Sequence, residues 1–376
     1  MTIPFIDLKT QIARVRDDLD RRMAAVVEHG QFILGPEVKA LESELAGFSG
    51  RSRAIGVSSG SDALLLALMA LGVGPGDAVL VPAFTFVAPA EMAVLLGATP
   101  VFVDVDPVTF NMDPASAEQA VSELKKRPEL RLKAIIAVDL FGVPADFQRL
   151  TTLAKEARVV LIEDAAQSFG AERFGRKSCS FGDISCTSFF PAKPLGCLGD
   201  GGMCFTDDEE IEAKIRSLLF HGCGEIRYEH VRIGVNGRLD TLQAAALQAK
   251  MTIFPDEIEK RNLVADRYRE LLAGVKDLIA PQPPEGCTSV WAQYCVLSRD
   301  AAHRKALFAA LDKEGVPHAI HYPMPLHQQP AYKQYADGPG QFPVSESLCE
   351  RIFALPMHPY LKEEDQARIA QALKNA

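Results

Sequence analysis

The feature that most constrains the fold is a regular alternation of short apolar runs with helix-like segments between residues 54 and 208. The apolar runs at residues 78–81 and 159–162 have the length and composition of buried strands. The segment at residues 61–72 is typical of an apolar helix. Short buried strands joined by helices favour a parallel sheet that is covered on both faces. The sequence therefore predicts an α/β fold.

The expected domain organisation rests on the chain length and on a change in the sequence pattern after this alternating region. With 376 residues, the chain can form one large domain and a smaller one. Two further apolar runs, residues 184–189 and 202–206, should finish the sheet as a hairpin-like pair. The proline-rich stretch 281–284 is typical of a connector before a second α/β unit. We expect a large domain with an N-terminal arm at residues 1–250 and a small C-terminal domain at residues 251–376.

A single lysine, Lys193, lies between an apolar, aromatic run and a stretch rich in glycine. A lysine in an apolar pocket loses solvation, so its pKa falls and the nucleophilic neutral amine becomes accessible. Asp164 ends a predicted buried strand, at the edge where α/β proteins bind ligands. Either residue alone is ambiguous. Together they supply an amine for a Schiff base and an anion for a pyridinium nitrogen, as pyridoxal phosphate requires.

Three further segments could hold parts of such a cofactor. Gly60 and Ser61 join a predicted strand to a helix, where free N–H groups favour a phosphate, although a simple helix cap is the more common role of such residues. Phe86 follows the next predicted strand and could stack on a planar ring, while core packing is the common role of a phenylalanine. Ser188, shortly before Lys193, could reach the same phosphate with its hydroxyl.

Two later loops contain polar residues whose role the residues themselves leave open. Asn236 and Arg238 precede a long helix, either as a cap and a surface charge or as donors to an anionic ligand. His321 and Tyr322 lie in a proline-containing loop that is either a structural turn or the lining of a substrate site. A metal site needs more ligands at fixed spacing, so we expect no bound metal.

Composition argues against several functional classes. The net charge of −9 disfavours nucleic-acid binding, which needs a basic surface. The N-terminus lacks the pattern of a signal peptide, and the apolar runs are too short for a membrane span. The eight cysteines form no C-x-x-C pair and are typical of reduced thiols. We expect a soluble, cytoplasmic protein.

These motifs together resemble the DegT/DnrJ/StrS family of pyridoxal-phosphate sugar aminotransferases over nearly the whole chain. The similar segments are residues 4–8, 30–36, 60–64, 84–88, 163–171, 188–193, 199–202 and 236–240. The resemblance implies the aspartate aminotransferase type of fold, PLP fold type I, with pyridoxal 5′-phosphate as the cofactor.

The resemblance also implies a role for each motif. Lys193 corresponds to the Schiff-base lysine and Asp164 to the carboxylate at the pyridine nitrogen. Gln167 matches the residue near the cofactor's phenolic oxygen, and Phe86 matches the stacking aromatic. Asn236 corresponds to an asparagine that reaches the phosphate from the other subunit, which implies a homodimer with shared active sites. The phosphate-binding positions correspond to Gly60, Ser61 and Ser188.

Within the family, the chain is most similar to 3-aminotransferases acting on UDP-2-acetamido-2-deoxy-3-keto-glucuronate. This similarity implies amino transfer from L-glutamate to that UDP-sugar, for surface polysaccharide or lipopolysaccharide synthesis. Arg238, His321 and Tyr322 are then candidates for contacting the sugar nucleotide. Leu198 and Gly237 depart from residues that are usual in the family near the site.

Three other functions stay open at this point. The nearest alternative is an aminotransferase for a dTDP-linked or other nucleotide-linked 3- or 4-keto-6-deoxyhexose. The family's 3-dehydratases carry a histidine where this chain has Lys193, which argues against them. A non-catalytic regulatory protein on the same fold would need neither Lys193 nor Asp164.

Overall fold

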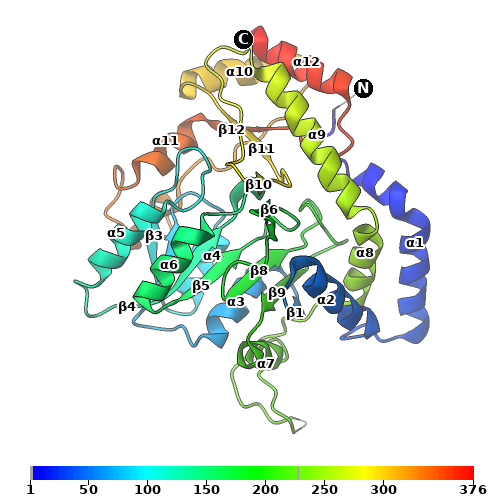
Figure 1. Cartoon of the computed structure of the whole chain (residues 1–376), viewed down its shortest axis with the longest axis vertical. Coiled ribbons are helices and arrows are strands. Elements are labelled where there is room, and N and C mark those ends of the chain that lie inside the picture. Colours follow the sequence, from blue (N-terminus) through cyan, green and yellow to red (C-terminus); the bar gives the residue numbers. More distant parts are fainter. Residues whose placement is uncertain (1–2, 227) are drawn as a thin grey trace.

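In the computed structural model, which describes residues 3–226 and 228–376, one seven-stranded sheet organises most of the chain (Figure 1). In spatial order its strands are β1 (Arg53–Val57), β9 (Gly202–Thr206), β8 (Ile184–Ser188), β5 (Val160–Asp164), β4 (Arg131–Val138), β2 (Asp77–Pro82) and β3 (Thr99–Val103). Strands β3, β2, β4, β5 and β8 pair in parallel, while β9 is antiparallel to both β8 and β1. The predicted parallel sheet and its closing hairpin-like pair are therefore confirmed.

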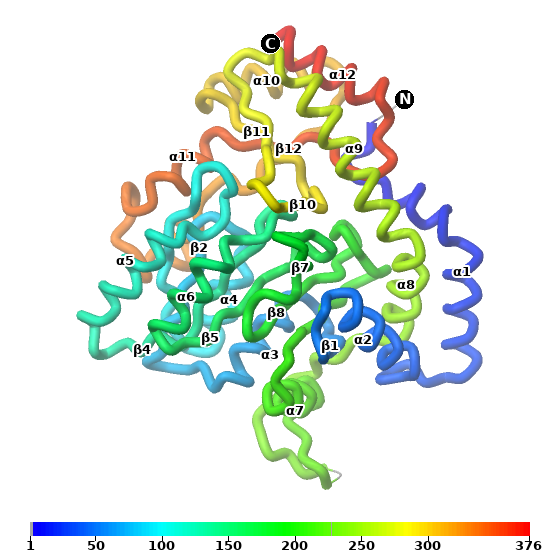
Figure 2. Tube along the Cα trace, viewed as in Figure 1, coloured from blue at the N-terminus to red at the C-terminus, as the bar shows by residue number. Residues whose placement is uncertain are grey.

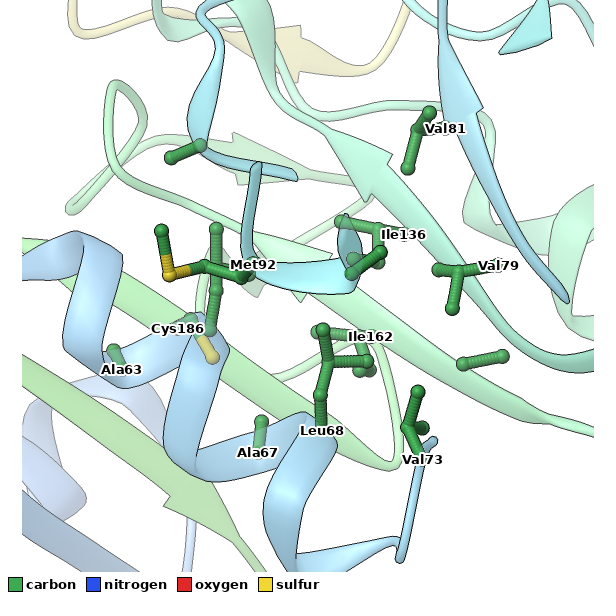
Figure 3. Close-up of a cluster of buried hydrophobic side chains, with 14 of the residues drawn as sticks. Ala63, Ala67, Leu68, Val73, Val79, Val81, Met92, Ile136, Ile162 and Cys186 are labelled. Atoms are coloured by element: carbon green, nitrogen blue, oxygen red, sulfur yellow. The ribbon is translucent and has the colours of Figure 1, made fainter. Parts of the chain in front are cut away.

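Helices cover both faces of this sheet. The helices on the first face are α3 (Gly60–Ala70), α4 (Ala88–Leu95) and α7 (Glu209–Leu218). Those on the second face are α5 (Pro114–Leu124), α6 (Phe147–Ala157), α2 (Pro36–Ser49) and α8 (Thr241–Met251). Successive side chains of a strand point to opposite faces, so Val79 and Val81 join the first core and Leu80 the second. Figure 3 shows Leu68 of α3 beside Ile162 in the first core.

The C-terminal part of the chain has a separate hydrophobic core, which also includes Ile3. Its elements are α9 (Phe254–Leu272), β11 (Tyr294–Leu297), α10 (Ala301–Lys313), β12 (Ile352–Leu355) and α12 (Glu363–Lys374). Helix α11 (Pro343–Arg351) contributes Leu348 and Cys349 to a different cluster, which includes Phe84. Strands β11 and β12 are antiparallel, and the ring of Tyr268 on α9 packs against that of Tyr294 in a tilted pair with centroids 4.9 Å apart. In Figure 2 this group lies together at one end of the molecule, and α9 connects it to α8.

The N-terminal segment differs in part from the expected arm. Helix α1 (Leu8–His29) runs beside α8, where Val15 and Leu19 pack on Ala246 and Ala249 (Figure 2). Helix α2, in contrast, packs into the core beside β1 and β9 because Leu41 and Leu45 present an apolar face. Three short strands, β6 (Glu172–Arg173), β7 (Arg176–Lys177) and β10 (Cys287–Thr288), form a small additional sheet. None of the described helices is long and apolar enough to cross a membrane.

Candidate active site

A cavity of about 530 Å³ lies where the parallel strands β2, β4, β5 and β8 end. This is the edge at which α/β sheets bind ligands. Most of the residues predicted for the site line this cavity. They are Gly60, Ser61, Phe86, Asp164, Gln167, Ser188, Lys193, His321 and Tyr322. Their separation in sequence shows that the strand order and the C-terminal loop together assemble the site.

The start of helix α3 forms one wall of the cavity. Ser59 caps this helix by accepting a hydrogen bond from the Asp62 N–H at 3.0 Å, and the N–H groups of Gly60 and Ser61 have no acceptor among the described residues. A Cβ atom on Gly60 would lie 2.6 Å from the Cβ of Ser188, so only glycine permits this approach. Backbone N–H groups and serine hydroxyls at a helix N-terminus are suited to a phosphate.

Lys193 lies in a tight turn that follows β8. Its backbone N–H donates to the Phe190 carbonyl at 2.8 Å, which turns the chain back toward the sheet. Burial lowers the pKa of Lys193, and attraction to the Asp164 carboxylate only partly opposes this shift. The two side chains form no direct ion pair in the described part of the chain. The direction of this pKa shift agrees with the environment expected for this amine, and its role stays a prediction.

Asp164 is the last residue of β5 and is only 5% exposed. Burial raises its pKa to about 6, while a hydrogen bond from the Ala166 N–H and the charge of Lys193 act in the opposite direction. The preceding Glu163 is fully occupied elsewhere, because it accepts hydrogen bonds from Cys179, Phe181 and Ser185. Of Glu163 and Asp164, only Asp164 is therefore available to a ligand. A cationic ligand would stabilise its ionised carboxylate most, because burial disfavours the charge.

The opposite wall combines an amide with aromatic rings. Gln167 Oε1 accepts from the Phe141 N–H at 2.7 Å, and its Nε2 donates to the Tyr322 hydroxyl at 3.2 Å. Burial lowers the pKa of His321, with the charge of Lys193 acting in the same direction. Phe86 leaves 52% of its surface exposed, and its ring centroid lies 6.4 Å from that of Tyr322. A large apolar ring exposed in a cavity is suited to stacking on a planar ligand.

Asn236 and Arg238 lie outside the cavity of this chain. Asn236 is exposed and forms an isolated bridge with Phe220, and Arg238 forms another with Val57. The Arg238 guanidinium lies 4.9 Å from the centre of the Phe220 ring, and its Nε is buried without a partner in the described chain. The structure therefore does not bring these two residues together with the others, and their proposed roles stay predictions.

The structure also adds residues that sequence reasoning missed. Thr85 and Gln293 line the cavity, and each has a buried oxygen without a hydrogen-bond partner in the described chain. Phe5 and Ile6, from the N-terminal segment, line it as well. In the sequence, the segment of Phe5 and Ile6 is marked only by the family resemblance, and nothing local distinguishes Gln293 from other glutamines. Within the described residues, no cluster of histidine, cysteine, aspartate or glutamate could hold a metal ion.

These residues fit pyridoxal phosphate. Two free backbone N–H groups with Ser61 and Ser188 suit the phosphate, the exposed Phe86 ring suits a planar heterocycle, and Lys193 and Asp164 provide an amine and a carboxylate.

Comparison with known proteins gives independent evidence of the family to which the chain belongs. The profile of the DegT/DnrJ/EryC1/StrS aminotransferase family matches residues 14–374. The chain is 48% identical over 373 residues to the UDP-2-acetamido-2-deoxy-3-oxo-D-glucuronate aminotransferase of Pseudomonas aeruginosa, covering 99% of this chain and 100% of that protein. A DegT/DnrJ/EryC1/StrS aminotransferase from Brucella abortus has a similar crystal structure, with a TM-score of 0.96 and 48% identity over 99% of each chain.

A further solved structure bears on the cofactor. NtdA from Bacillus subtilis, described with bound cofactor PMP, matches with a TM-score of 0.91 and 30% identity over 100% of this chain and 85% of that chain. The cavity chemistry, the family profile and these similarities agree. The chain belongs to the DegT/DnrJ/EryC1/StrS aminotransferase family and is a pyridoxal-phosphate-dependent enzyme.

Proposed function

We propose that the chain transfers the amino group of L-glutamate to UDP-2-acetamido-2-deoxy-3-keto-glucuronate. The observation that carries this proposal is that Lys193 and Asp164 line one cavity beside the free N–H groups of α3. The Pseudomonas aeruginosa relative, named for this substrate, supports the choice of sugar because its similarity extends over its full length. The product would serve the synthesis of surface polysaccharide or lipopolysaccharide.

Each residue has a role that follows from its environment. Pyridoxal phosphate supplies an electron-withdrawing ring that stabilises negative charge on the carbon attached to the amino group. Lys193, whose pKa burial lowers, can act as a neutral amine and take the proton from the α-carbon of the amino acid. Asp164 favours a protonated ring nitrogen, because an ionised carboxylate buried there requires a cationic partner. Gly60, Ser61 and Ser188 bind the phosphate in this proposal.

The substrate side of the cavity is proposed from its remaining polar groups. His321 and Tyr322 line the cavity, and in this proposal they contact the sugar nucleotide. Because Arg238 lies outside this chain's own cavity, we propose that it contacts the substrate bound in the partner subunit. A planar guanidinium suits a carboxylate or a diphosphate, since it donates two parallel hydrogen bonds.

We also propose a homodimer in which the partner subunit supplies Asn236 and Arg238 to each site. Both residues lie outside this chain's cavity, and apolar side chains are exposed nearby. Those exposed side chains include Phe32, Ile33, Leu34, Phe220, Val231 and Ile233. The division of each chain into residues 1–250 and 251–376 is part of the same proposal. We place the reaction in the cytoplasm, because all eight cysteines are free thiols, which suits a reducing compartment.

The first test is spectroscopic. The purified protein is loaded with pyridoxal phosphate, and its absorption is recorded before and after L-glutamate is added, with Lys193→Ala as the control. We expect the band of the bound cofactor to change with glutamate, and the ketosugar to restore it while the 3-amino sugar forms. An unchanged band would refute glutamate as the donor. A normal band in the Lys193→Ala variant would refute the role of Lys193.

The shared site needs a separate experiment. Chains carrying Lys193→Ala are mixed with chains carrying Asn236→Ala under conditions that exchange subunits. If sites are shared, one of the two sites in each mixed dimer has no substitution, so activity returns although neither variant is active alone. Two inactive variants that stay inactive after verified exchange would contradict shared sites.

A further inference from the structure

Lys250, on helix α8, is a buried amine outside the cavity, and the mechanism above does not use it. Lys250 is only 2% exposed, and its Nζ donates a hydrogen bond to the carbonyl of Gly196 at 2.5 Å. Among the described residues no carboxylate lies within ion-pair distance of it, and Glu257 attracts it only from farther away. A buried lysine without an ionic partner is unfavourable, because the ammonium loses its water. Packing alone would favour methionine or leucine at this position.

The neighbouring thiol does not act as the missing anion. Cys197 Sγ donates to the carbonyls of Phe189 and Gly199, each at 3.0 Å, and burial raises its pKa, so the thiol stays neutral. Burial lowers the pKa of Lys250 to about 8. Both the charged and the neutral amine have N–H groups, so the hydrogen bond to Gly196 persists in either state.

The carbonyl that Lys250 contacts belongs to the segment that positions Lys193, residues 189–201, here called the lysine turn. The turn is compact, since Phe189 and Gly201 are joined by a backbone hydrogen bond of 2.7 Å. A Cβ atom on Gly196 would lie 2.4 Å from the Pro191 carbonyl oxygen, so the backbone is packed tightly against itself. A displacement of Gly196 is therefore transmitted to Lys193, three residues earlier.

Helix α8 contacts the lysine turn at a second point. Gln243 Oε1 accepts from the Leu198 N–H at 2.8 Å. Gln243 and Lys250 are seven residues apart, which is two helical turns, so both side chains leave the same face of α8. Lys250 binds the Gly196 carbonyl and Gln243 binds the Leu198 N–H, so α8 holds the lysine turn at two points.

We propose that Lys250 is a positioning residue, which holds the lysine turn through the Gly196 carbonyl so that the Lys193 amine faces Asp164 and the phosphate-binding start of α3. The inference rests on the proposed role of Lys193 and concerns how that amine is held. A displacement of a reacting group by about 1 Å can lower a rate roughly 100-fold. Lys250 therefore acts on the rate at which Lys193 reacts, through a contact outside the cavity.

The test compares Lys250→Met, which keeps the volume and removes the donor, with Lys250→Arg, which keeps a donor. Lys260→Met on α9 is the matched control, because the Lys260 side chain is 40% exposed and pairs with Asp256 at 2.8 Å. Two properties are measured: the rate at which apoprotein captures pyridoxal phosphate, by absorption, and the pH midpoint of the bound cofactor's spectrum. The thermal midpoint of each apoprotein is recorded in parallel.

We expect Lys250→Met to capture the cofactor about tenfold more slowly, within the range known for misplaced reacting groups. Its pH midpoint should rise, because a loosened turn lets water reach Lys193 and reverses part of its desolvation. Lys250→Arg should recover part of both effects, and Lys260→Met should match the wild type. A Lys250→Met protein within twofold of the wild-type rate and with the same midpoint would overturn the inference.

Two further measurements keep the outcome decisive. If Lys250→Met does not fold, Gln243→Leu removes the other contact of α8. A slower capture by that variant supports the inference, and an unchanged capture overturns it. Borohydride reduction and peptide mapping of the wild type identify the lysine that holds the cofactor. A lysine other than Lys193 would refute the proposed function itself, whereas attachment at Lys193 with unaltered Lys250→Met behaviour refutes only the positioning role.

Discussion

Replacing Asp164 with asparagine should stabilise the apoprotein while it impairs the loaded enzyme. Burial raises the pKa of Asp164 from its ordinary value of 3.8 to about 6. Between these values the folded chain binds a proton that the unfolded chain does not, so the free energy of unfolding falls as the pH rises from about 4 to about 6. At roughly 1.4 kcal/mol per pKa unit, this lost stability amounts to about 3 kcal/mol above pH 6.

Asparagine removes this penalty with little change of shape. Its Oδ1 can still accept the hydrogen bond from the Ala166 N–H, which is 3.1 Å long in the wild type. An unfolding entropy of about 2.1 cal/mol/K per residue converts 3 kcal/mol into a rise of about 4 °C in the thermal midpoint of a cooperative unit of this size. The difference between variant and wild type should shrink to about half at pH 5, where the wild-type carboxyl is mostly protonated when folded.

The assay is thermal unfolding of both apoproteins from pH 5 to pH 8, repeated after loading with pyridoxal phosphate. In the loaded proteins the difference in thermal midpoint between variant and wild type should become smaller, because only the ionised Asp164 is stabilised by a protonated ring nitrogen. Pyridoxal phosphate should thus raise the midpoint of the wild type more than that of Asp164→Asn. An apo variant that is no more stable than the wild type at pH 8 would refute the argument that desolvation dominates at Asp164.

Three shorter predictions concern the other walls of the cavity. Gly60→Ala should weaken cofactor affinity about tenfold or more, because overpacking against Ser188 costs about 1–3 kcal/mol. Titration of the cofactor by absorption measures this affinity. Gly74→Ala is the control that should bind normally, because its added Cβ meets no atom of the described residues closer than 4.0 Å. Tyr322→Phe should lower the free energy of unfolding by only about 1 kcal/mol, the value of one hydrogen bond. The same variant should reduce turnover of the ketosugar, and unchanged turnover would exclude a role of that hydroxyl in the reaction.

Much of the fold and of the candidate site could be predicted from the sequence, because their signals are local. Short apolar runs alternate with helix-like segments whatever the strand order, so the parallel sheet was predictable. Lys193 and Asp164 were recognisable because an amine in an apolar run and a carboxylate at the end of a buried strand each carry a local signature. The division of the chain at residue 250 is not decided by such signals and stays a prediction.

The contacts that complete the site could not be predicted in this way. Gln167 and Tyr322 are 155 residues apart, and Lys250 lies 54 residues from the Gly196 carbonyl that it contacts. Nothing in the local sequence indicates that Thr85 and Gln293 each have an oxygen at the cavity with no hydrogen-bond partner among the described residues. Hydrophobic periodicity and residue chemistry act between neighbours in the chain, so the sequence by itself determined the fold class and indicated the candidate reacting groups. Strand order and packing act between distant segments, and only the tertiary structure decided which side chains share the cavity and that Asn236 and Arg238 lie outside it.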